Sequence, residues 1–163
     1  MPEQINHDYE VSSGCICDRH WEVPWARLTD TTPTASNPAE LTSRTPGTQL
    51  TGTILTVNAT LQTAIIDFTA GMIYYPSVRN VLTYNAGVEA TWGAINIGDA
   101  VYYDNSATMP AGVYLSTSPL DNTGAANTLF GFVVPRRPTD SAAVGGATAS
   151  TQHCAIMQRG AGS

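Results

Sequence analysis

The sequence predicts an all-β protein, a small β-barrel or sandwich that carries an extended, mostly irregular N-terminal arm. Short runs rich in Thr, Ile, Val, Leu and Tyr recur from residue 48 onward, and Gly, Pro and Asn turn signals separate them roughly every 8–12 residues. Charged residues make up only 12% of the chain, whereas exposed helices normally carry many Glu, Lys and Arg side chains. The first part of the chain lacks these runs and is rich in proline instead.

Residues 1–47 form the predicted arm. Prolines at positions 2, 24, 33, 38 and 46 disfavour both helix interiors and central strands. One helical turn is predicted at residues 37–41, where Asn37 suits the N-cap and Pro38 the first helical position. Fully stretched, the arm would reach on the order of 150 Å at ~3.3 Å per residue. We therefore expect the arm to cross a neighbouring subunit, and the body, residues 48–160, to fold without it.

The body is predicted to hold about eight or nine short strands, as in a sandwich or barrel. The runs that predict them are residues 50–57, 63–68, 72–75, 79–84, 88–92, 99–104, 113–117, 128–134 and 152–158. Turn signals such as Asn58-Ala59 and Asn85-Ala86-Gly87 separate these runs. Residues 138–151 are low in complexity and are predicted to form a long loop.

Charge and composition exclude several classes of partner. The formal net charge is −6, and all seven basic residues are arginine. Nucleic acids and anionic membranes both require a basic protein face, so neither is an expected partner. The first residues lack the basic start and apolar stretch of a signal peptide, and no apolar run is long enough to span a bilayer. We therefore expect synthesis in a cytoplasm.

Cys15, Cys17, His20 and Cys154 are the candidates for a metal site. The Cys-x-Cys spacing differs from the Cys-x₂-Cys spacing of common zinc sites. The sequence therefore predicts neither a metal nor a cofactor, and small apolar contacts for the cysteines.

The sequence carries no recognisable catalytic motif. Gly-x-Ser-x-Gly, His-Glu-x-x-His and glycine-rich phosphate loops are all missing. His153 and Cys154 are neighbours in a predicted strand and should face opposite sides. Asp99 and Asp104 are separated by an odd spacing, so they too should face apart, and each is predicted to shape a turn. We therefore predict that the protein is not an enzyme.

Several aromatic and basic residues are candidates for contacts with other subunits. Tyrosine and tryptophan are favoured at protein interfaces because each joins a large apolar body to a polar tip. One pair of adjacent arginines follows the predicted strand at 128–134, and guanidinium groups bind carboxylates on a partner well. The candidates are Trp21, Trp25, Tyr102, Tyr103, Arg136 and Arg137.

Residues 95–134 read INIGDAVYYDNSATMPAGVYLSTSPLDNTGAANTLFGFVV. A Gly-Asp turn, an aromatic strand that ends in aspartate, a polar loop and a Gly-Phe-Val-Val strand follow one another. This layout resembles the C-terminal half of small phage head-decoration (capsid cement) proteins. The resemblance implies a β-barrel that binds the major capsid protein on the outer surface of the virion, often as a homotrimer. Residues 1–90 show no motif of that family.

The sequence thus favours a structural virion protein that stabilises a tailed-phage head by bridging capsomers. A carbohydrate- or receptor-binding β-module of a phage tail or fibre is the alternative, because outward tyrosines and Asp/Asn loops also suit sugars. A small hydrolase is a third possibility, but it would need a nucleophile that the sequence does not identify.

Overall fold

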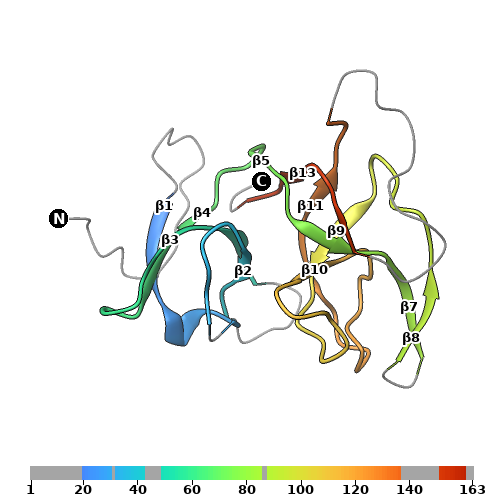
Figure 1. The fold of residues 1–163 in the computed structure, drawn as a ribbon, viewed down its shortest axis with the longest axis horizontal. Helices are drawn as coiled ribbons and strands as arrows, with labels where there is room; N and C mark the ends of the chain where they lie inside the picture. Colours follow the sequence, from blue (N-terminus) through green and yellow to red (C-terminus); the bar gives the residue numbers. More distant parts are fainter. Residues whose placement is uncertain (1–19, 31, 43–48, 86–87, 137–150, 161–163) are drawn as a thin grey trace.

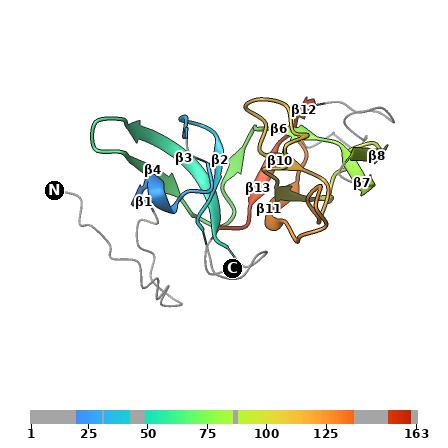
Figure 2. The same ribbon diagram turned by 90° about the horizontal axis from the view of Figure 1, so that it is seen from below.

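The computed structural model describes residues 20–30, 32–42, 49–85, 88–136 and 151–160. Within these ranges, every regular element except the 3₁₀ turn η1 (Trp25–Arg27) is a β-strand. The predicted all-β class is therefore confirmed. A four-stranded sheet lies at one end of the longest dimension, a two-stranded hairpin lies at the other, and a seven-stranded sheet lies between them (Figure 1). The view from below keeps the same order (Figure 2).

The four-stranded sheet has the antiparallel order β1-β4-β3-β2. Its strands are β1 (His20–Pro24), β2 (Pro38–Glu40), β3 (Thr51–Asn58) and β4 (Thr63–Asp67). In β1, Trp21 and Val23 are buried while their neighbours are more exposed, which is the two-residue period of a strand. Both side chains belong to a core that also includes Ile54, Ile66 and Phe68.

The prediction of an irregular arm was wrong for residues 20–42. Strand β1 pairs with β4 over five residues, from His20 opposite Asp67 to Pro24 opposite Thr63. Prolines do not prevent this, because Pro24 is the last residue of an edge strand, where a missing N–H is tolerated. Residues 1–19 and 43–48 lie outside the described residues.

The helical turn predicted at residues 37–41 is also wrong, because β2 occupies this segment as the other edge strand. Ala39 lies opposite Gly52 of β3, and the Ile54 amide donates to the Asn37 carbonyl at 2.9 Å. Pairing with β3 thus outweighs the local capping signal. Gly52 has no alternative here, since a Cβ atom would lie 2.6 Å from the Asp67 carbonyl oxygen.

The seven-stranded sheet has the order β12-β6-β10-β9-β11-β13-β5 and curls into a half-barrel. Its strands are β5 (Ile73–Tyr74), β6 (Ser77–Arg79), β9 (Ala100–Tyr103), β10 (Leu115–Ser116), β11 (Thr128–Val133), β12 (Thr151–His153) and β13 (Ile156–Gln158). Strands β6 and β10 are parallel, and the other neighbours are antiparallel. Val101, Phe130 and Ile156 lie in its core.

Strand β11 has a bulge and approaches β13 closely next to it. The register between β11 and β9 shifts between Leu129 and Gly131. A Cβ atom on Gly131 would lie 2.2 Å from the carbonyl oxygen of Met157, so the contact between β11 and β13 requires glycine at this position.

Most predicted strands are present, and most of their bounds differ from the predicted ones. The runs at 79–84 and 88–92 correspond largely to the hairpin of β7 (Val81–Asn85) and β8 (Val88–Trp92). The run at 152–158 divides into two strands, because β12 pairs with β6 whereas β13 pairs with β11 and β5. The predicted loop at 138–151 lies outside the described residues, apart from Thr151, which begins β12.

Gln158 joins the two large sheets. Its buried side-chain amide donates to the carbonyl oxygens of Asp67 at 3.0 Å and Thr69 at 2.9 Å. Its Oε1 accepts a bond from the Thr53 hydroxyl at 2.9 Å. A second link runs from the Thr51 hydroxyl to the Leu129 carbonyl at 3.1 Å. These bonds connect β3, β4 and the segment after β4 with β11 and β13 of the seven-stranded sheet.

Candidate interaction surface

Two of the aromatic residues predicted to contact other subunits are buried in the protein's own core. Trp21 is 9% exposed and its ring centroid lies 4.7 Å from that of Phe68. Tyr103 is 2% exposed and stacks on Tyr114 at 6.1 Å. The prediction that these two side chains contact other subunits is wrong for this fold, because neither is accessible.

The remaining candidates have different surroundings. Tyr102 and Trp25 are half-buried, so Tyr102 and Tyr103 divide between two faces of β9 as strand geometry requires. Arg136 is exposed, and its guanidinium carbon lies 5.6 Å from the centroid of the Tyr75 ring. Arg137 lies outside the described residues.

The metal-site candidates do not come together among the described residues. His20 lies 3.6 Å from the Asp67 carboxylate, and Cys154 is 1% exposed in the core of the seven-stranded sheet. Burial raises the pKa of the Cys154 thiol to about 11, although nearby Arg136 opposes the shift. Across the described ranges, no group of three or more His, Cys, Asp or Glu side chains is placed to hold a metal ion. Cys15 and Cys17 lie outside those ranges.

Asp67 sits at the junction of β4 and β5. Its carboxylate accepts bonds from the Thr69 amide at 2.8 Å and from the Tyr74 hydroxyl. Burial alone would raise the pKa of Asp67, but these hydrogen bonds and the charge of His20 outweigh it and lower the pKa. Burial and the Asp67 carboxylate raise the pKa of Tyr74. This contact fixes the position of β5 against the four-stranded sheet.

Asp99 and Asp104 shape turns as the sequence predicts. Asp99 Oδ2 accepts a bond from the Asn96 amide at 2.7 Å. Asp104 is fully buried and accepts bonds from the Ser106 amide at 2.9 Å and the Ser116 hydroxyl at 2.7 Å. His153 is exposed while Cys154 is buried, so these neighbours face apart, also as predicted.

An exposed row of large apolar side chains crosses the outer face of the seven-stranded sheet. Met157 of β13 lies directly opposite Ile73 of β5 and Phe132 of β11. Ile73 is 48% exposed, Met157 39% and Phe132 38%. We call Ile73, Met157 and Phe132 the apolar row. Three large apolar side chains in register on adjacent strands form a contiguous patch rather than scattered exposure.

Arginines flank the apolar row on its two sides along the strand direction. Arg159 is exposed two residues after Met157 and therefore lies on the same face of the strand line. On the other side, the exposed Tyr75 follows Ile73 by two residues, and the Arg136 guanidinium lies over its ring. Strand β5 is also the edge of its sheet. The face thus combines aromatic, methionine and arginine side chains, the types enriched at protein interfaces.

The sequence did not identify the apolar row. Phe132 and Met157 each have an apolar neighbour in their strand, Val133 and Ile156 respectively. The sequence pattern therefore does not reveal which of the two neighbours faces outward. Only the pairing of β5, β13 and β11, strands far apart in the chain, brings the three side chains together. The burial of Ile156 and Gln158 on either side of Met157, which places Met157 outward, is known only from the structure.

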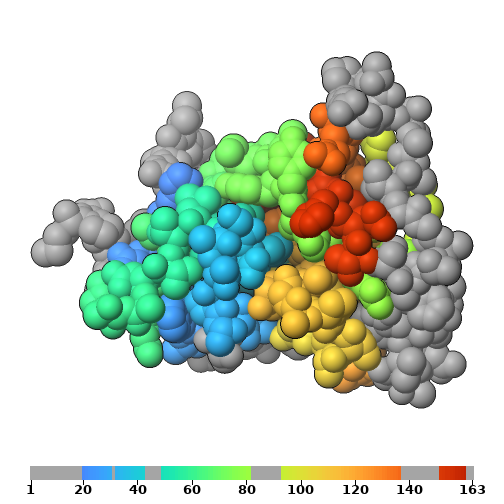
Figure 3. All heavy atoms as spheres, in the orientation of Figure 1, coloured from blue at the N-terminus to red at the C-terminus, as the bar shows by residue number. Residues whose placement is uncertain are grey.

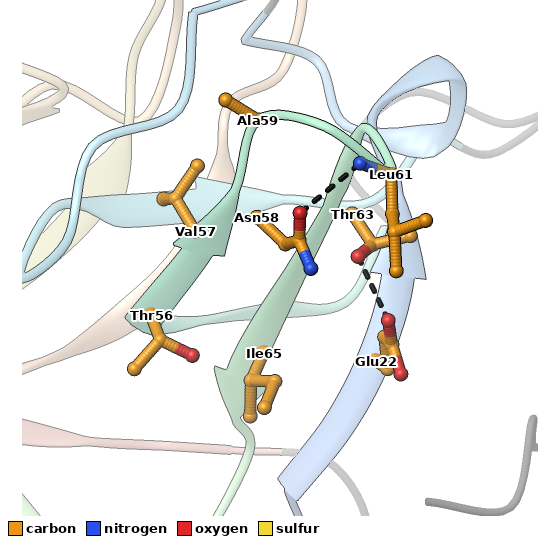
Figure 4. A pocket seen from close by; sticks show the side chains of 8 residues that line it. All are labelled: Glu22, Thr56, Val57, Asn58, Ala59, Leu61, Thr63 and Ile65. Atoms are coloured by element: carbon orange, nitrogen blue, oxygen red, sulfur yellow. Dashed lines mark hydrogen bonds between the residues drawn. The ribbon is translucent and has the colours of Figure 1, made fainter.

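A shallow groove lies on the β3–β4 hairpin, well away from the apolar row. Its volume is about 510 Å³, and Figure 4 shows side chains from three strands around it. Thr63 donates to the Glu22 carboxylate at 2.8 Å, and Asn58 Oδ1 accepts from the Leu61 amide at 3.0 Å. The Asn58 contact confirms the predicted hairpin turn at Asn58-Ala59.

No protein-family model, curated protein or solved structure matches this chain. Among the residues that the structure describes, no helix is long and apolar enough to cross a membrane.

Proposed function

We propose that the protein is a structural virion protein that decorates the outer surface of a tailed-phage head. In this proposal it binds the major capsid protein, bridges capsomers and thereby stabilises the shell. Neighbouring copies associate as a homotrimer, and the chain is made in the host cytoplasm before it binds the assembled head. The all-β fold is in keeping with the β-barrel family that residues 95–134 resemble.

The apolar row is the observation that carries this proposal. Small molecules bind mainly in concave, enclosed sites, whereas the outer face of a sheet with exposed Ile73, Met157 and Phe132 suits another protein surface. Desolvation of these side chains supplies the favourable free energy of contact. Arg136 and Arg159, on the two sides of the row, would pair with carboxylates of the partner and fix the orientation of the complex.

Co-sedimentation of the purified protein with matching phage heads tests this proposal. The variant Met157→Asp places a charge in the centre of the apolar row and should weaken head binding by about tenfold or more, as expected for a central interface residue. Phe132→Thr keeps a strand-forming residue and should weaken binding in the same direction.

The matched control is Leu61→Asp. Leu61 is 65% exposed on the β3–β4 turn, so this variant introduces the same charge away from the apolar row and should bind as the wild type does. Thermal unfolding of each variant checks that the fold is intact. If folded Met157→Asp and Phe132→Thr both bind with wild-type affinity, the apolar row is not the capsid contact.

A carbohydrate- or receptor-binding β-module is the second candidate, and the groove of Figure 4 favours it. Hydroxyl, amide and carboxylate groups of Thr56, Asn58, Thr63 and Glu22 stand beside apolar side chains there, a combination that suits sugars. Binding to a glycan array that is lost in Glu22→Gln, with no binding to heads, would favour this candidate over decoration.

A further inference from the structure

A polar pocket lies where the four-stranded and seven-stranded sheets meet. It has a volume of about 280 Å³ and is lined from β2, β9 and the loop that precedes β11. The space-filling view shows the light blue segment around β2 beside the gold segment of residues near 110–120 (Figure 3). The lining residues are Thr29, Glu40, Thr42, Gln49, Tyr103, Asn105, Asp121, Ala125, Ala126 and Asn127.

Two buried polar groups face this pocket. Glu40 is 7% exposed, and its Oε1 accepts a bond from the Thr29 hydroxyl at 3.1 Å. Tyr103 is 2% exposed, and its hydroxyl has no hydrogen-bond partner among the described residues. A buried hydroxyl without a partner is rare in folded proteins, because its loss of hydration is not compensated. A ligand in the pocket would supply the missing partner.

The electrostatics of the pocket favour a cation. Glu40 and Asp121 contribute two carboxylates, and no basic side chain is present among the described residues that line it. Asp30 stands close enough that its charge, with that of Glu40, adds to burial in raising the pKa of Tyr103. A recess with charges of one sign and low-dielectric walls concentrates the field and attracts the opposite charge.

Size and ligand geometry narrow the kind of cation. The pocket volume stands at the lower limit of the roughly 300–1,000 Å³ typical of sites for drug-sized molecules, which favours a small group over an oligosaccharide or nucleotide. The described acidic side chains are not grouped as metal ligands. The terminal group of a single basic side chain matches both the volume and the carboxylates, since guanidinium and ammonium groups are hydrogen-bond donors only.

We propose that this pocket binds one guanidinium or ammonium group, the end of an arginine or lysine side chain that a partner protein presents. Glu40 receives the charged hydrogen bonds, and the Tyr103 hydroxyl accepts another N–H from the same group. The cation site follows from the pocket itself. Only the identification of the partner as the capsid protein rests on the proposed function.

Titration of the full-length protein with N-acetyl-arginine methylamide, followed by amide NMR, tests the site. We expect saturable shifts at residues lining the pocket, among them Glu40, Asn105 and Ala125. The citrulline analogue has the same shape without the charge and should bind about tenfold more weakly, the factor for one hydrogen bond to a charged group. Equal shifts from both compounds, shifts with glucose alone, or no shifts would overturn the proposal.

Two variants connect the shifts to the pocket. Glu40→Gln and Tyr103→Phe preserve side-chain size, and each should weaken binding of the arginine probe by several-fold or more. Glu22→Gln is the matched control, because Glu22 is also a strand carboxylate that accepts a threonine hydroxyl bond, yet it lies in the other groove. Its affinity for the probe should be unchanged, and a loss equal to that of Glu40→Gln would contradict the assignment.

Two further experiments identify the source of the cation. Arg44 follows Thr42 by two residues in the sequence, so the variant Arg44→Gln tests whether an arginine of the chain itself occupies the pocket. Probe binding that appears only in Arg44→Gln would show the chain's own arginine as occupant and overturn the proposal. If the wild-type protein binds the probe but Glu40→Gln binds heads as well as the wild type does, a capsid side chain is not the source of the cation. That result would leave the proposed decoration of heads uncontradicted. Loss of both in Glu40→Gln supports the full proposal.

Discussion

Gln158 shows how one buried polar side chain holds the two large sheets together. Its amide group donates to two backbone carbonyls, one at the last residue of β4 and one two residues later, and its side-chain carbonyl accepts a bond from one hydroxyl of β3. The next residue toward the N-terminus, Met157, faces the opposite side of β13 and is exposed. Adjacent positions in one strand therefore have very different roles, one in assembly of the fold and one on its surface.

We expect Gln158→Met to reduce the free energy of unfolding by about 3 kcal/mol or more, because up to three buried groups lose their partner. The side chain stays long and unbranched, so little volume changes. Met157→Gln is the matched control on the exposed face and should change stability by less than about 1 kcal/mol. Urea unfolding measures both. Similar losses in the two variants would contradict the role given to Gln158.

Glu40 should make stability depend on pH. Burial raises the pKa of its carboxyl, and hydrogen bonds from Thr128 and Thr29 offset only part of the shift. The folded state therefore binds the Glu40 proton more tightly than the unfolded state, so this residue's contribution to stability falls as pH rises above its ordinary value of 4.5. Glu40→Gln should be more stable relative to wild type at pH 7 than at pH 4.

Asp121 provides a control of opposite sign. Burial alone would raise its pKa, but hydrogen bonds from Thr123, Ala125 and Gly124 lower it. Its stabilising contribution is present above the ordinary value of 3.8 and is lost as pH falls through the lowered pKa. Asp121→Asn should therefore be less stable than wild type at pH 7, with the difference shrinking in acid. Chemical unfolding from pH 3 to pH 7 measures the free energy of unfolding of Glu40→Gln and Asp121→Asn relative to wild type. The same pH trend in both variants would contradict these assignments.

At the scale of elements, most strands could be predicted because their residues are locally typical of strands. Thr51–Asn58, Thr63–Asp67 and Thr128–Val133 combine β-branched and aromatic residues with Gly or Asn turn signals at their ends. These strands could be predicted without any knowledge of tertiary contacts. Their bounds differ by a residue or two, since strand ends depend on where the pairing strand stops.

Strands β1 and β2 were missed for the opposite reason. His20–Pro24 and Pro38–Glu40 are short, and each contains a proline that local rules assign to irregular structure. They become strands only because β4 and β3 offer unpaired edges and apolar neighbours. Such edge strands are specified by tertiary contacts, which the local pattern of the arm does not contain.

Truncation tests this revised view of residues 20–42. A chain that begins at Gln49 lacks β1 and β2, which bury Trp21, Val23 and Ala39 in the first core, and we expect it to lose cooperative unfolding. A chain that begins at Arg19 retains both strands and should keep the wild-type circular dichroism spectrum. If the shorter chain unfolds cooperatively at the same midpoint temperature as the wild type, the body folds without residues 20–42, as the sequence had predicted.

For the molecule as a whole, the sequence favours a protein-binding surface but does not locate one. Low charge, the absence of lysine and the aromatic content favoured a protein-binding role. The buried Trp21 and Tyr103 were chosen by residue type, whereas the apolar row depends on the register of β5, β13 and β11. Register between distant strands is set by the completed fold, so no local signal identifies the row.

The apolar row is in keeping with the proposed decoration of a symmetric shell. In that proposal, each contact between the apolar row and a capsid subunit is small, but copies that bridge neighbouring capsomers bind together, and avidity increases their combined strength. A protein that binds only the mature shell stabilises that state in proportion to the logarithm of its concentration over the dissociation constant. The predicted effect is greater endurance of filled heads rather than their assembly.

The most direct measurement compares DNA release from filled heads with and without the protein, during heating or dilution into low salt. We expect heads that carry the wild-type protein to retain DNA at temperatures and dilutions where bare heads release it. Heads incubated with Met157→Asp should behave like bare heads, while Leu61→Asp should protect as the wild type does. Identical release curves for bare and fully decorated heads would contradict the cementing role.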